Sequence, residues 1–206
     1  INVENTESNR RDYREVLFRS NDALKSYVSG VILYDETIRQ KNAAGISWAE
    51  VLSRERIILG IKVDTGAKVL AGAPEEKMTE GLDGLRDRLK EYAAMGARFA
   101  KWRAVIRITD MLPSPMCVNV NAHALARYAA LCQAAQIVPI VEPEVLMDGG
   151  HDIDRCFDVT QRVLNKTFQE LRVQRVELEG MILKPNMAIA GKKCAKQASV
   201  HEVAEK

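Results

Sequence analysis

Ionisable side chains recur about every 40 residues, at or near the ends of four apolar segments of the chain. They are Lys62 with Asp64, Lys101 with Arg103, Glu142 with Glu144, and Lys184. Crowded lysines repel one another and partial burial disfavours the charged form, so one of them could be a neutral amine near neutral pH. A neutral amine attacks carbonyl carbons to form a Schiff base, and a nearby carboxylate can relay the protons. The pattern indicates a Schiff-base lyase.

The remaining cations indicate an anionic substrate. Arg103 with Lys62 would suit a phosphate group. Each charge also has a purely structural explanation: Lys62 could pair with Asp64, Arg103 with either glutamate, and Lys184 could extend to the surface along its methylene stem. The regular recurrence over four segments favours a shared polar site over coincidence.

The elements that must position these residues alternate between apolar runs and helical periodicity. Strands are predicted over 27–36, 57–64, 98–108, 137–146 and 176–187. Helices are predicted over 7–18 with a Thr6 cap, after Ser47, over 79–95 ending at Gly96, from Asn119 or Asn121 to about 136, and over 153–172 with an Asp152 cap. The segment 71–77 is predicted to be a polar loop. Alternating strands and helices indicate parallel strands with helical crossovers.

Two architectures fit this alternation, an open doubly wound sheet and a closed (β/α)8 TIM barrel. The sequence contains neither of the glycine-rich phosphate-binding motifs of the nucleotide-binding open sheets. A barrel with units of about 40 residues needs about 320 residues. We therefore expect residues 1–206 to form one α/β domain, about five consecutive βα units of a truncated barrel. The capping-box pattern from Ser199 to Glu202 predicts one more helix at the end.

Composition excludes several classes of function. The net charge of +2 indicates no nucleic-acid partner, and no apolar run approaches a membrane span. The N-terminus has no signal-peptide layout. The scattered cysteines indicate free thiols in a reducing, cytoplasmic compartment, and the histidines lack metal-ligand spacing, so we expect no metal site. The cysteines are Cys117, Cys132, Cys156 and Cys194.

Several segments together resemble class I fructose-1,6-bisphosphate aldolases, in register over essentially the whole chain. They include "NVENTESNRR", "GIKVDTG", "FAKWRAV", "IVPIVEPEVL" and "LEGMILKPNM". The resemblance implies a (β/α)8 barrel, a homotetramer, and reversible cleavage of fructose 1,6-bisphosphate to dihydroxyacetone phosphate and glyceraldehyde 3-phosphate in glycolysis and gluconeogenesis. It implies no metal and no cofactor.

The resemblance also implies residue roles. Lys184 would be the Schiff-base nucleophile, Glu142 the general acid and base, Lys101 its assistant in proton handling, and Glu144 the residue that positions the lysines. Phosphates or hydroxyls of the sugar phosphate would be contacted by Lys62, Arg103 and Arg10. The strands would be the second to sixth of the barrel. The first, seventh and eighth, and the aspartate of the first strand, would lie outside residues 1–206.

Two alternatives remain open at this point. One is a catalytically inert barrel fragment that only packs or binds partners, and the other is a different Schiff-base barrel lyase or a transaldolase. Two further interpretations concern structure. Trp102 lies between Lys101 and Arg103 in a strand, so it is expected on the opposite face, against helices. The stretch "DGGHD" is expected to be a turn with a helix cap rather than a metal loop.

Overall fold

A computed structural model describes residues 2–19 and 21–206, and its main sheet contains five parallel strands. The strands, in both spatial and sequence order, are β1 (Gly30–Leu33), β2 (Ile58–Lys62), β5 (Phe99–Ile106), β6 (Val138–Val145) and β7 (Ile182–Leu183). A doubly wound sheet reverses its strand order and carries helices on both faces. The unbroken order is that of a barrel wall, so the barrel is the architecture that fits.

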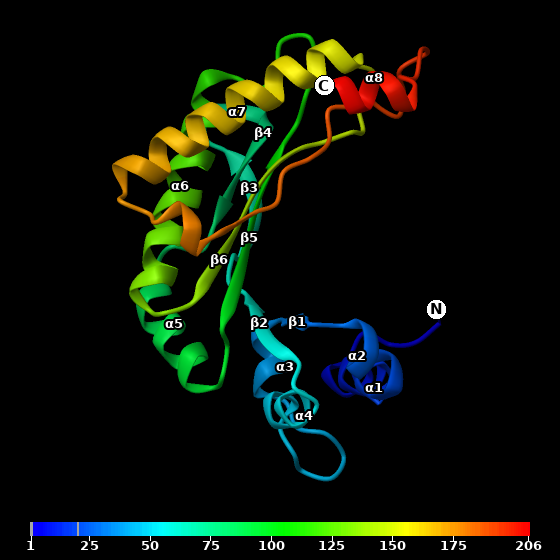
Figure 1. The fold of residues 1–206 in the computed structure, drawn as a ribbon, viewed down its shortest axis with the longest axis vertical. Coiled ribbons are helices and arrows are strands. Elements are labelled where there is room, and N and C mark those ends of the chain that lie inside the picture. The colour runs from blue at the N-terminus through cyan, green and yellow to red at the C-terminus, as the bar shows by residue number, and fades with distance from the viewer. Residues whose placement is uncertain (1, 20) are drawn as a thin grey trace.

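The positions of the three long helices also fit a barrel wall, because all three cover the same face of the sheet. Figure 1 shows α5 (Leu85–Ala94), α6 (Pro115–Ala134) and α7 (Ile153–Val173) on one face of β5 and β6, with the other face open. The predicted Asp152 cap of α7 is confirmed, because its carboxylate accepts a hydrogen bond from the backbone N–H of Arg155. Helix α7 buries an apolar side that includes Cys156, Val159 and Val163, as its periodicity predicts.

Strand β5 sorts its side chains between the two faces. Ala100, Trp102 and Ala104 are buried against the helices, and Trp102 stacks on Tyr128 of α6 with ring centroids 5.5 Å apart. The prediction for Trp102 is therefore confirmed. Lys101 and Arg103 alternate with these residues and point to the open face. The open face is thus where the charged side chains of the sheet gather.

The open face is apolar around Phe99, and the packing of this ring requires a glycine on the neighbouring strand. Gly60 of β2 lies opposite Phe99 of β5, and a Cβ built on Gly60 would stand 2.4 Å from the Phe99 ring. Only a residue without a side chain leaves room for that ring. Phe99 and Lys101 share a face, so the charged side chains lie next to this apolar part of the face, on its side towards the carboxyl ends of the strands.

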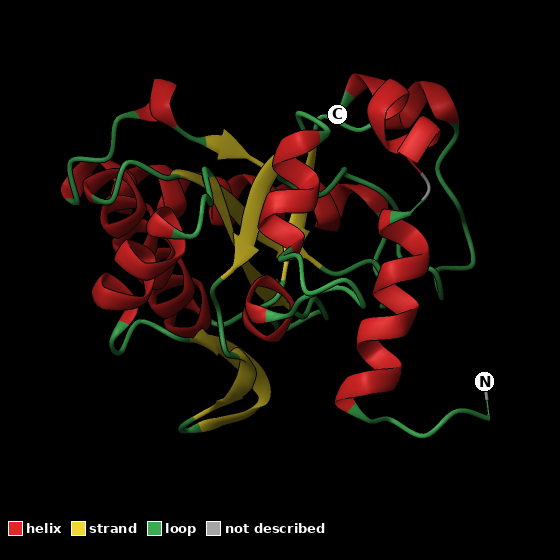
Figure 2. Ribbon diagram, turned by 90° about the horizontal axis from the view of Figure 1, so that it is seen from below, coloured by secondary structure: helices red, strands yellow, loops and turns green. Residues whose placement is uncertain are grey.

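The N-terminal helices are α1 (Glu7–Phe18), α2 (Asn21–Tyr27), α3 (Asp35–Arg39) and α4 (Trp48–Arg54). The predicted caps are confirmed, since the Thr6 and Ser47 hydroxyls accept hydrogen bonds from backbone N–H groups of α1 and α4. Helix α1 lies to one side of the sheet (Figure 2), and its side chains Tyr13 and Leu17 are exposed.

The two outermost strands are shorter than the sequence predicts. The strand predicted over 27–36 is present only as β1, Gly30–Leu33, because helices flank it on both sides. Its Val/Ile/Leu run is not buried on both faces, since Ile32 is 41% exposed. Strand β7 has only two residues, after a short 3-10 helix, η1 (Leu178–Gly180). The apolar run before Lys184 is not buried either, since Ile182 is 49% exposed.

The prediction of a polar loop over 71–77 is wrong. This segment belongs to an antiparallel hairpin, β3 (Gly66–Leu70) with β4 (Ala73–Glu80). Glu76 fastens the hairpin to α6, because its carboxylate accepts hydrogen bonds from the backbone N–H of Ser114 (2.8 Å) and from the Ser114 hydroxyl (2.5 Å). The predicted helix over 79–95 accordingly begins only at Leu85 and ends before Gly96, whose φ is +102°.

Helix α6 begins earlier than predicted. Ser114 caps it by accepting from the backbone N–H of Cys117, and Pro115 follows at the first helical position. Asn121, one of the predicted starting residues, is buried inside the helix. Its side chain accepts a hydrogen bond from the backbone N–H of Thr79 and donates to the carbonyl of Lys77. Asn121 therefore holds the hairpin rather than capping the helix.

The C-terminal helix α8 (Val200–Glu205) begins with the predicted capping box, in which Ser199 and Glu202 satisfy each other's backbone N–H groups. All four cysteines are free thiols, as predicted. Within the described residues, no helix has both the length and the apolar character needed to cross a bilayer.

Candidate active site

Glu142 lies at the centre of the predicted site. Only 2% of this residue is exposed, and its two carboxylate oxygens face two different lysines. Oε1 is 2.5 Å from Lys184 Nζ, and Oε2 is 3.1 Å from Lys101 Nζ, an ion pair without hydrogen-bond geometry. The three residues come from β6, from the position after β7, and from β5. The structure therefore brings together the three residues assigned to Schiff-base chemistry.

Sheet register explains this contact. Val141 pairs with Leu183, so Glu142 and Lys184, the next residue on each strand, lie side by side on the same face. The backbone N–H of Lys184 donates to the carbonyl of Val141 over 2.9 Å. The side chain of Lys184 is 58% exposed, more than the partial burial that the sequence suggests. The amine can thus be reached from solvent while its carboxylate partner is buried.

Arg103 and Glu144 form a second pair, two residues farther along β5 and β6. Both the Nε and an Nη of Arg103 contact Glu144 Oε2. Within residues 2–19 and 21–206, no ion pair joins Glu144 to a lysine. In this structure Glu144 is therefore held by Arg103 rather than by a lysine.

Lys62 lies on β2, opposite Lys101 in register. Its Nζ is 2.5 Å from Asp64 Oδ1 and 3.2 Å from the Asp64 carbonyl oxygen, so the strand-end ion pair considered from the sequence is present. The same Nζ lies 5.8 Å from the centroid of the Tyr34 ring. Tyr34 is not among the predicted site residues, although it directly follows β1 as Lys184 directly follows β7.

Arg10 is the one predicted site residue that the structure places elsewhere. Its Nε and Nη2 lie 3.1 Å and 2.6 Å from the two oxygens of Glu36, on α3, and Arg14 contacts the same carboxylate. Hydrogen bonds from Arg10 and then Arg14 lower the pKa of Glu36 to about 2. In the described part of the chain, no ion pair of Arg10 reaches the lysine cluster.

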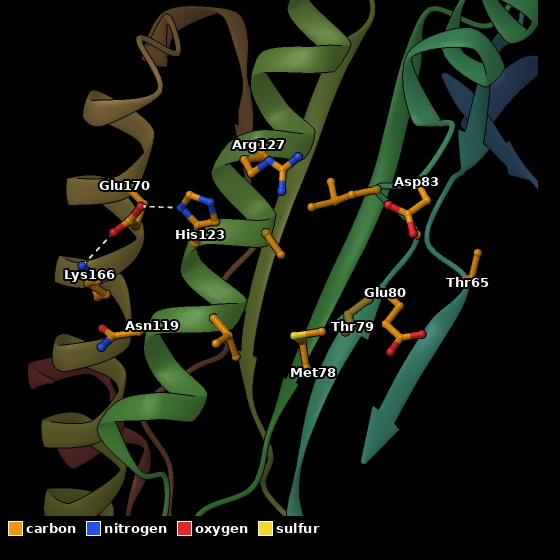
Figure 3. A pocket seen from close by; sticks show the side chains of 14 residues that line it. Thr65, Met78, Thr79, Glu80, Asp83, Asn119, His123, Arg127, Lys166 and Glu170 are labelled. Carbon is orange, nitrogen blue, oxygen red and sulfur yellow. Dashed lines mark hydrogen bonds and ion pairs between the residues drawn. The ribbon is translucent and has the colours of Figure 1, made fainter. Parts of the chain in front are cut away.

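A cavity of about 840 Å³ lies away from these residues, between the β3–β4 hairpin, α6 and α7 (Figure 3). On its helix side, His123 Nδ1 is 3.0 Å from Glu170 Oε2, and Lys166 Nζ is 2.7 Å from Glu170 Oε1. Lys166, and then His123, lower the pKa of Glu170. The cavity is on the outer, helical side of the sheet, so its size does not make it the site of Schiff-base chemistry.

The geometry of the lysine cluster defines what it can do. One buried carboxylate lies within reach of two amines, so a proton can pass between Glu142 and a group bound to Lys184. Lys184 directly follows β7, as predicted, and the active sites of barrels lie at the carboxyl ends of their strands. The prediction of a strand-end position is wrong for Lys101 and Glu142, which lie inside β5 and β6 because both strands continue beyond them. No group of His, Cys, Asp and Glu among the described residues could hold a metal ion. The chemistry available to these three residues is amine addition to a carbonyl with proton relay.

Comparisons with known proteins point to one family over almost the whole chain. A family model described as fructose-bisphosphate aldolase class-I matches residues 1–206. A probable fructose-bisphosphate aldolase class 1 of Xanthomonas campestris is 58% identical over 205 residues, covering 100% of this chain and 61% of that protein. Fructose-bisphosphate aldolase 4, cytosolic, of Arabidopsis thaliana is 52% identical over 191 residues, covering 93% of this chain and 48% of that protein.

A solved structure is similar in fold as well. A crystal structure of fructose-bisphosphate aldolase from Plasmodium falciparum, in complex with TRAP and a small-molecule inhibitor, superposes with a TM-score of 0.93 at 47% identity. The match covers 98% of this chain and 58% of that one. The chain thus spans between 48% and 61% of the length of these three proteins.

Proposed function

The chain belongs to the class I fructose-bisphosphate aldolase family, and we propose that it carries the Schiff-base centre of a fructose-bisphosphate aldolase. The observation that supports this most directly is the contact of buried Glu142 with Lys184 on one oxygen and Lys101 on the other. A nucleophilic amine next to a buried proton donor is what imine chemistry requires. The proposed reaction is the reversible cleavage of fructose 1,6-bisphosphate into dihydroxyacetone phosphate and glyceraldehyde 3-phosphate, in glycolysis and gluconeogenesis.

The proposed mechanism begins with Lys184. Its neutral Nζ attacks the C2 ketone, and a proton moves from nitrogen to the former carbonyl oxygen to give a carbinolamine. Glu142, protonated at this stage, gives its proton to the hydroxyl, which leaves as water, and the iminium forms. The iminium accepts the electron pair of the C3–C4 bond as that bond breaks, and the C4 hydroxyl gives its proton to the aspartate that the family resemblance places on the first strand, outside residues 1–206. Protonation of the enamine at C3 and hydrolysis then release the second product.

The other site residues have proposed roles in this scheme. Lys101 holds Glu142 through its second oxygen and exchanges protons with it, and Glu144 supports the lysines by fixing Arg103 between the strands. Lys62 and Arg103, whose side chains are 35% and 41% exposed, contact phosphates or hydroxyls of the sugar phosphate. Arg10 is assigned the same role, which requires its pair with Glu36 to open.

The proposal extends to the assembly of the protein. The strands β1, β2, β5, β6 and β7 would be the second to sixth strands of a (β/α)8 barrel, which agrees with their sequential order. The protein would act as a cytoplasmic homotetramer on a small sugar phosphate, without nucleic acid, membrane, metal or cofactor. The cytosolic relative from Arabidopsis thaliana supports the compartment.

Chemical trapping tests the proposal. The protein is incubated with dihydroxyacetone phosphate, reduced with borohydride, and digested for mass spectrometry, with Lys184→Met as the control. We expect a stable adduct on the peptide containing Lys184 and none in the variant. A wild-type protein that is folded but gives no adduct, or gives it on another lysine, would contradict the mechanism. Excess EDTA is expected to leave the cleavage activity unchanged, and its loss would contradict the metal-free scheme.

A further inference from the structure

A proline interrupts the pairing of β6 with β7 beside Lys184. In a parallel ladder, alternate residues of a strand bond to the neighbouring strand, and each donates to the residue before its partner and accepts from the residue after it. Lys184 fulfils the first half, with its N–H on the carbonyl of Val141. The second half would need an N–H from Pro143, which has none. The regular ladder therefore stops at Lys184.

The side chain of Asn186 continues the connection where the backbone cannot. The backbone N–H of Val145, the next free donor of β6, gives its hydrogen bond to Asn186 Oδ1 over 3.1 Å. The amide nitrogen of Asn186 donates to Thr160 Oγ1 on α7 over 2.9 Å and to the carbonyl of Met187 over 3.0 Å. One amide thus joins the end of β6, helix α7 and the chain that follows Lys184.

This arrangement fixes the backbone of Lys184 from both sides. Before the lysine, the ladder bond to Val141 holds it, and two residues after the lysine, Asn186 ties the chain to the same strand that carries Glu142. Without Asn186, the segment beyond Pro185 has no side-chain link to Val145. The Nζ of a long, 58% exposed side chain would then meet Glu142 Oε1 less often.

We propose that Asn186 is a positioning residue for Lys184, because it continues the connection to β6 beyond the ladder bond that Pro143 removes and so holds the nucleophile against Glu142. The inference rests on the proposed function, since it concerns the reaction of Lys184. Asn186 itself touches neither the substrate nor the reacting atoms. Its effect should therefore appear in the rate of the chemical steps rather than in substrate binding.

The chain supplies a matched control at the other end of β7. Gln133 of α6 accepts a hydrogen bond from the backbone N–H of Glu177 and donates to the carbonyls of Glu177 and Gly180. Like Asn186, it is an amide that fastens the segment around β7 to neighbouring elements. It acts before the strand begins, so its loss weakens the attachment of the segment without freeing the chain after Lys184.

The experiment compares Asn186→Leu, Asn186→Ala, Asn186→Asp and Gln133→Ala in steady-state cleavage of fructose 1,6-bisphosphate and in borohydride trapping with dihydroxyacetone phosphate. Misplacing a reacting group by about 1 Å costs on the order of 10²-fold in rate. We expect a kcat loss of that order for the leucine and alanine variants, with KM changed less than about threefold. Asn186→Asp keeps the acceptor for Val145, so its kcat should lie closer to the wild type.

The outcomes separate the two proposals. If wild-type protein shows no trapped adduct on Lys184, the proposed function fails. Suppose that the wild-type protein gives the trapped adduct on Lys184. The positioning inference is then wrong if folded Asn186→Leu keeps the wild-type kcat, or if its kcat falls no further than that of Gln133→Ala. A rise in KM at unchanged kcat would also contradict it. Asn186→Leu keeps the branched shape of the native side chain without its hydrogen bonds, and it decides the question if Asn186→Ala does not fold.

Discussion

Lys184 and Glu142 lie side by side across the β6–β7 edge of the sheet, with Nζ 2.5 Å from Oε1, although 41 residues separate them in the chain. The two side chains differ sharply in their surroundings, since the lysine is 58% exposed and the glutamate 3%. A substrate can therefore approach the amine from solvent, while the carboxylate that is proposed to handle protons stays shielded from water.

Replacing Glu142 by glutamine should lower the rate of catalysis and leave the fold intact. Glutamine has nearly the same volume but cannot donate and recover the proton that carbinolamine dehydration needs. A positioned acid or base contributes about 10²–10⁴-fold, so we expect a kcat reduction in that range. Steady-state kinetics measures it, with Glu75→Gln as the control, because Glu75 forms an exposed pair with Arg107. Equal effects of the two substitutions would contradict the role of Glu142.

The stability that Glu36 contributes should be lost in acid. Arg10 and Arg14 lower its pKa from 4.5 to about 2, so the folded protein holds this proton less tightly than the unfolded chain. The contribution is complete above pH 4.5 and disappears as the pH falls through about 2. Urea denaturation of wild type and Glu36→Gln should show a stability difference near pH 7 that narrows below pH 4.5.

The control for that experiment is Glu50→Gln, which removes an exposed i,i+4 pair with Arg54. Surface pairs of this kind contribute about 0–1 kcal/mol. A stability difference for Glu36→Gln that is no larger than that of Glu50→Gln, or one that does not change with pH, would show that the two arginines do not stabilise the fold through Glu36.

Gly60→Ala should destabilise the sheet. The new Cβ would stand 2.4 Å from the Phe99 ring, so either the ring or β2 must move. Overpacking of this kind costs about 1–3 kcal/mol. Thermal or urea unfolding measures the loss, and Gly150→Ala is the control, since its Cβ would have an ordinary contact of 3.9 Å with the Lys193 carbonyl oxygen. If adding Phe99→Leu to Gly60→Ala does not recover part of the lost stability, the clash with the Phe99 ring is not the cause of the loss.

The four thiols should differ in reactivity. Burial raises the pKa of Cys117 to about 12 and also raises that of Cys132, whereas Cys194 is only partly buried. We expect iodoacetamide near pH 8 to alkylate Cys194 in the native protein, and the buried cysteines only after unfolding. Mass spectrometry of timed samples follows each thiol. Native-state alkylation of Cys132 at the rate of Cys194 would contradict the burial described for α6.

Much of the fold follows from sequence pattern because its long elements are strongly periodic. Strand β5 alternates between the helix face and the open face, and α7 shows a clear apolar side with a capping aspartate, so both were predicted close to their observed limits. The proximity of Lys101, Glu142 and Lys184 was also predictable, since their recurrence matches the repeat of the βα unit and each follows an apolar segment.

Other parts could not be predicted because tertiary contacts decide them. The β3–β4 hairpin contains little apolar pattern, and Glu76 and Asn121 hold it to α6 by polar contacts that no local rule reveals. The start of α6 did carry a signal, Ser114 before Pro115, which outweighs the later asparagines. The pairing of Arg10 with Glu36 depends on the position of α1 relative to α3, which a single sequence does not encode in any local pattern.

The register between β6 and β7 determines which position in the sequence can carry the proposed nucleophile. Val141 pairs with Leu183, so the next residues, Glu142 and Lys184, share a face. Side chains on a strand alternate between faces, so a residue one place earlier or later than Lys184 would point away from Glu142. A shift of the pairing by one residue would turn the lysine towards the helices, so backbone pairing of residues outside the reaction aligns the nucleophile with the acid.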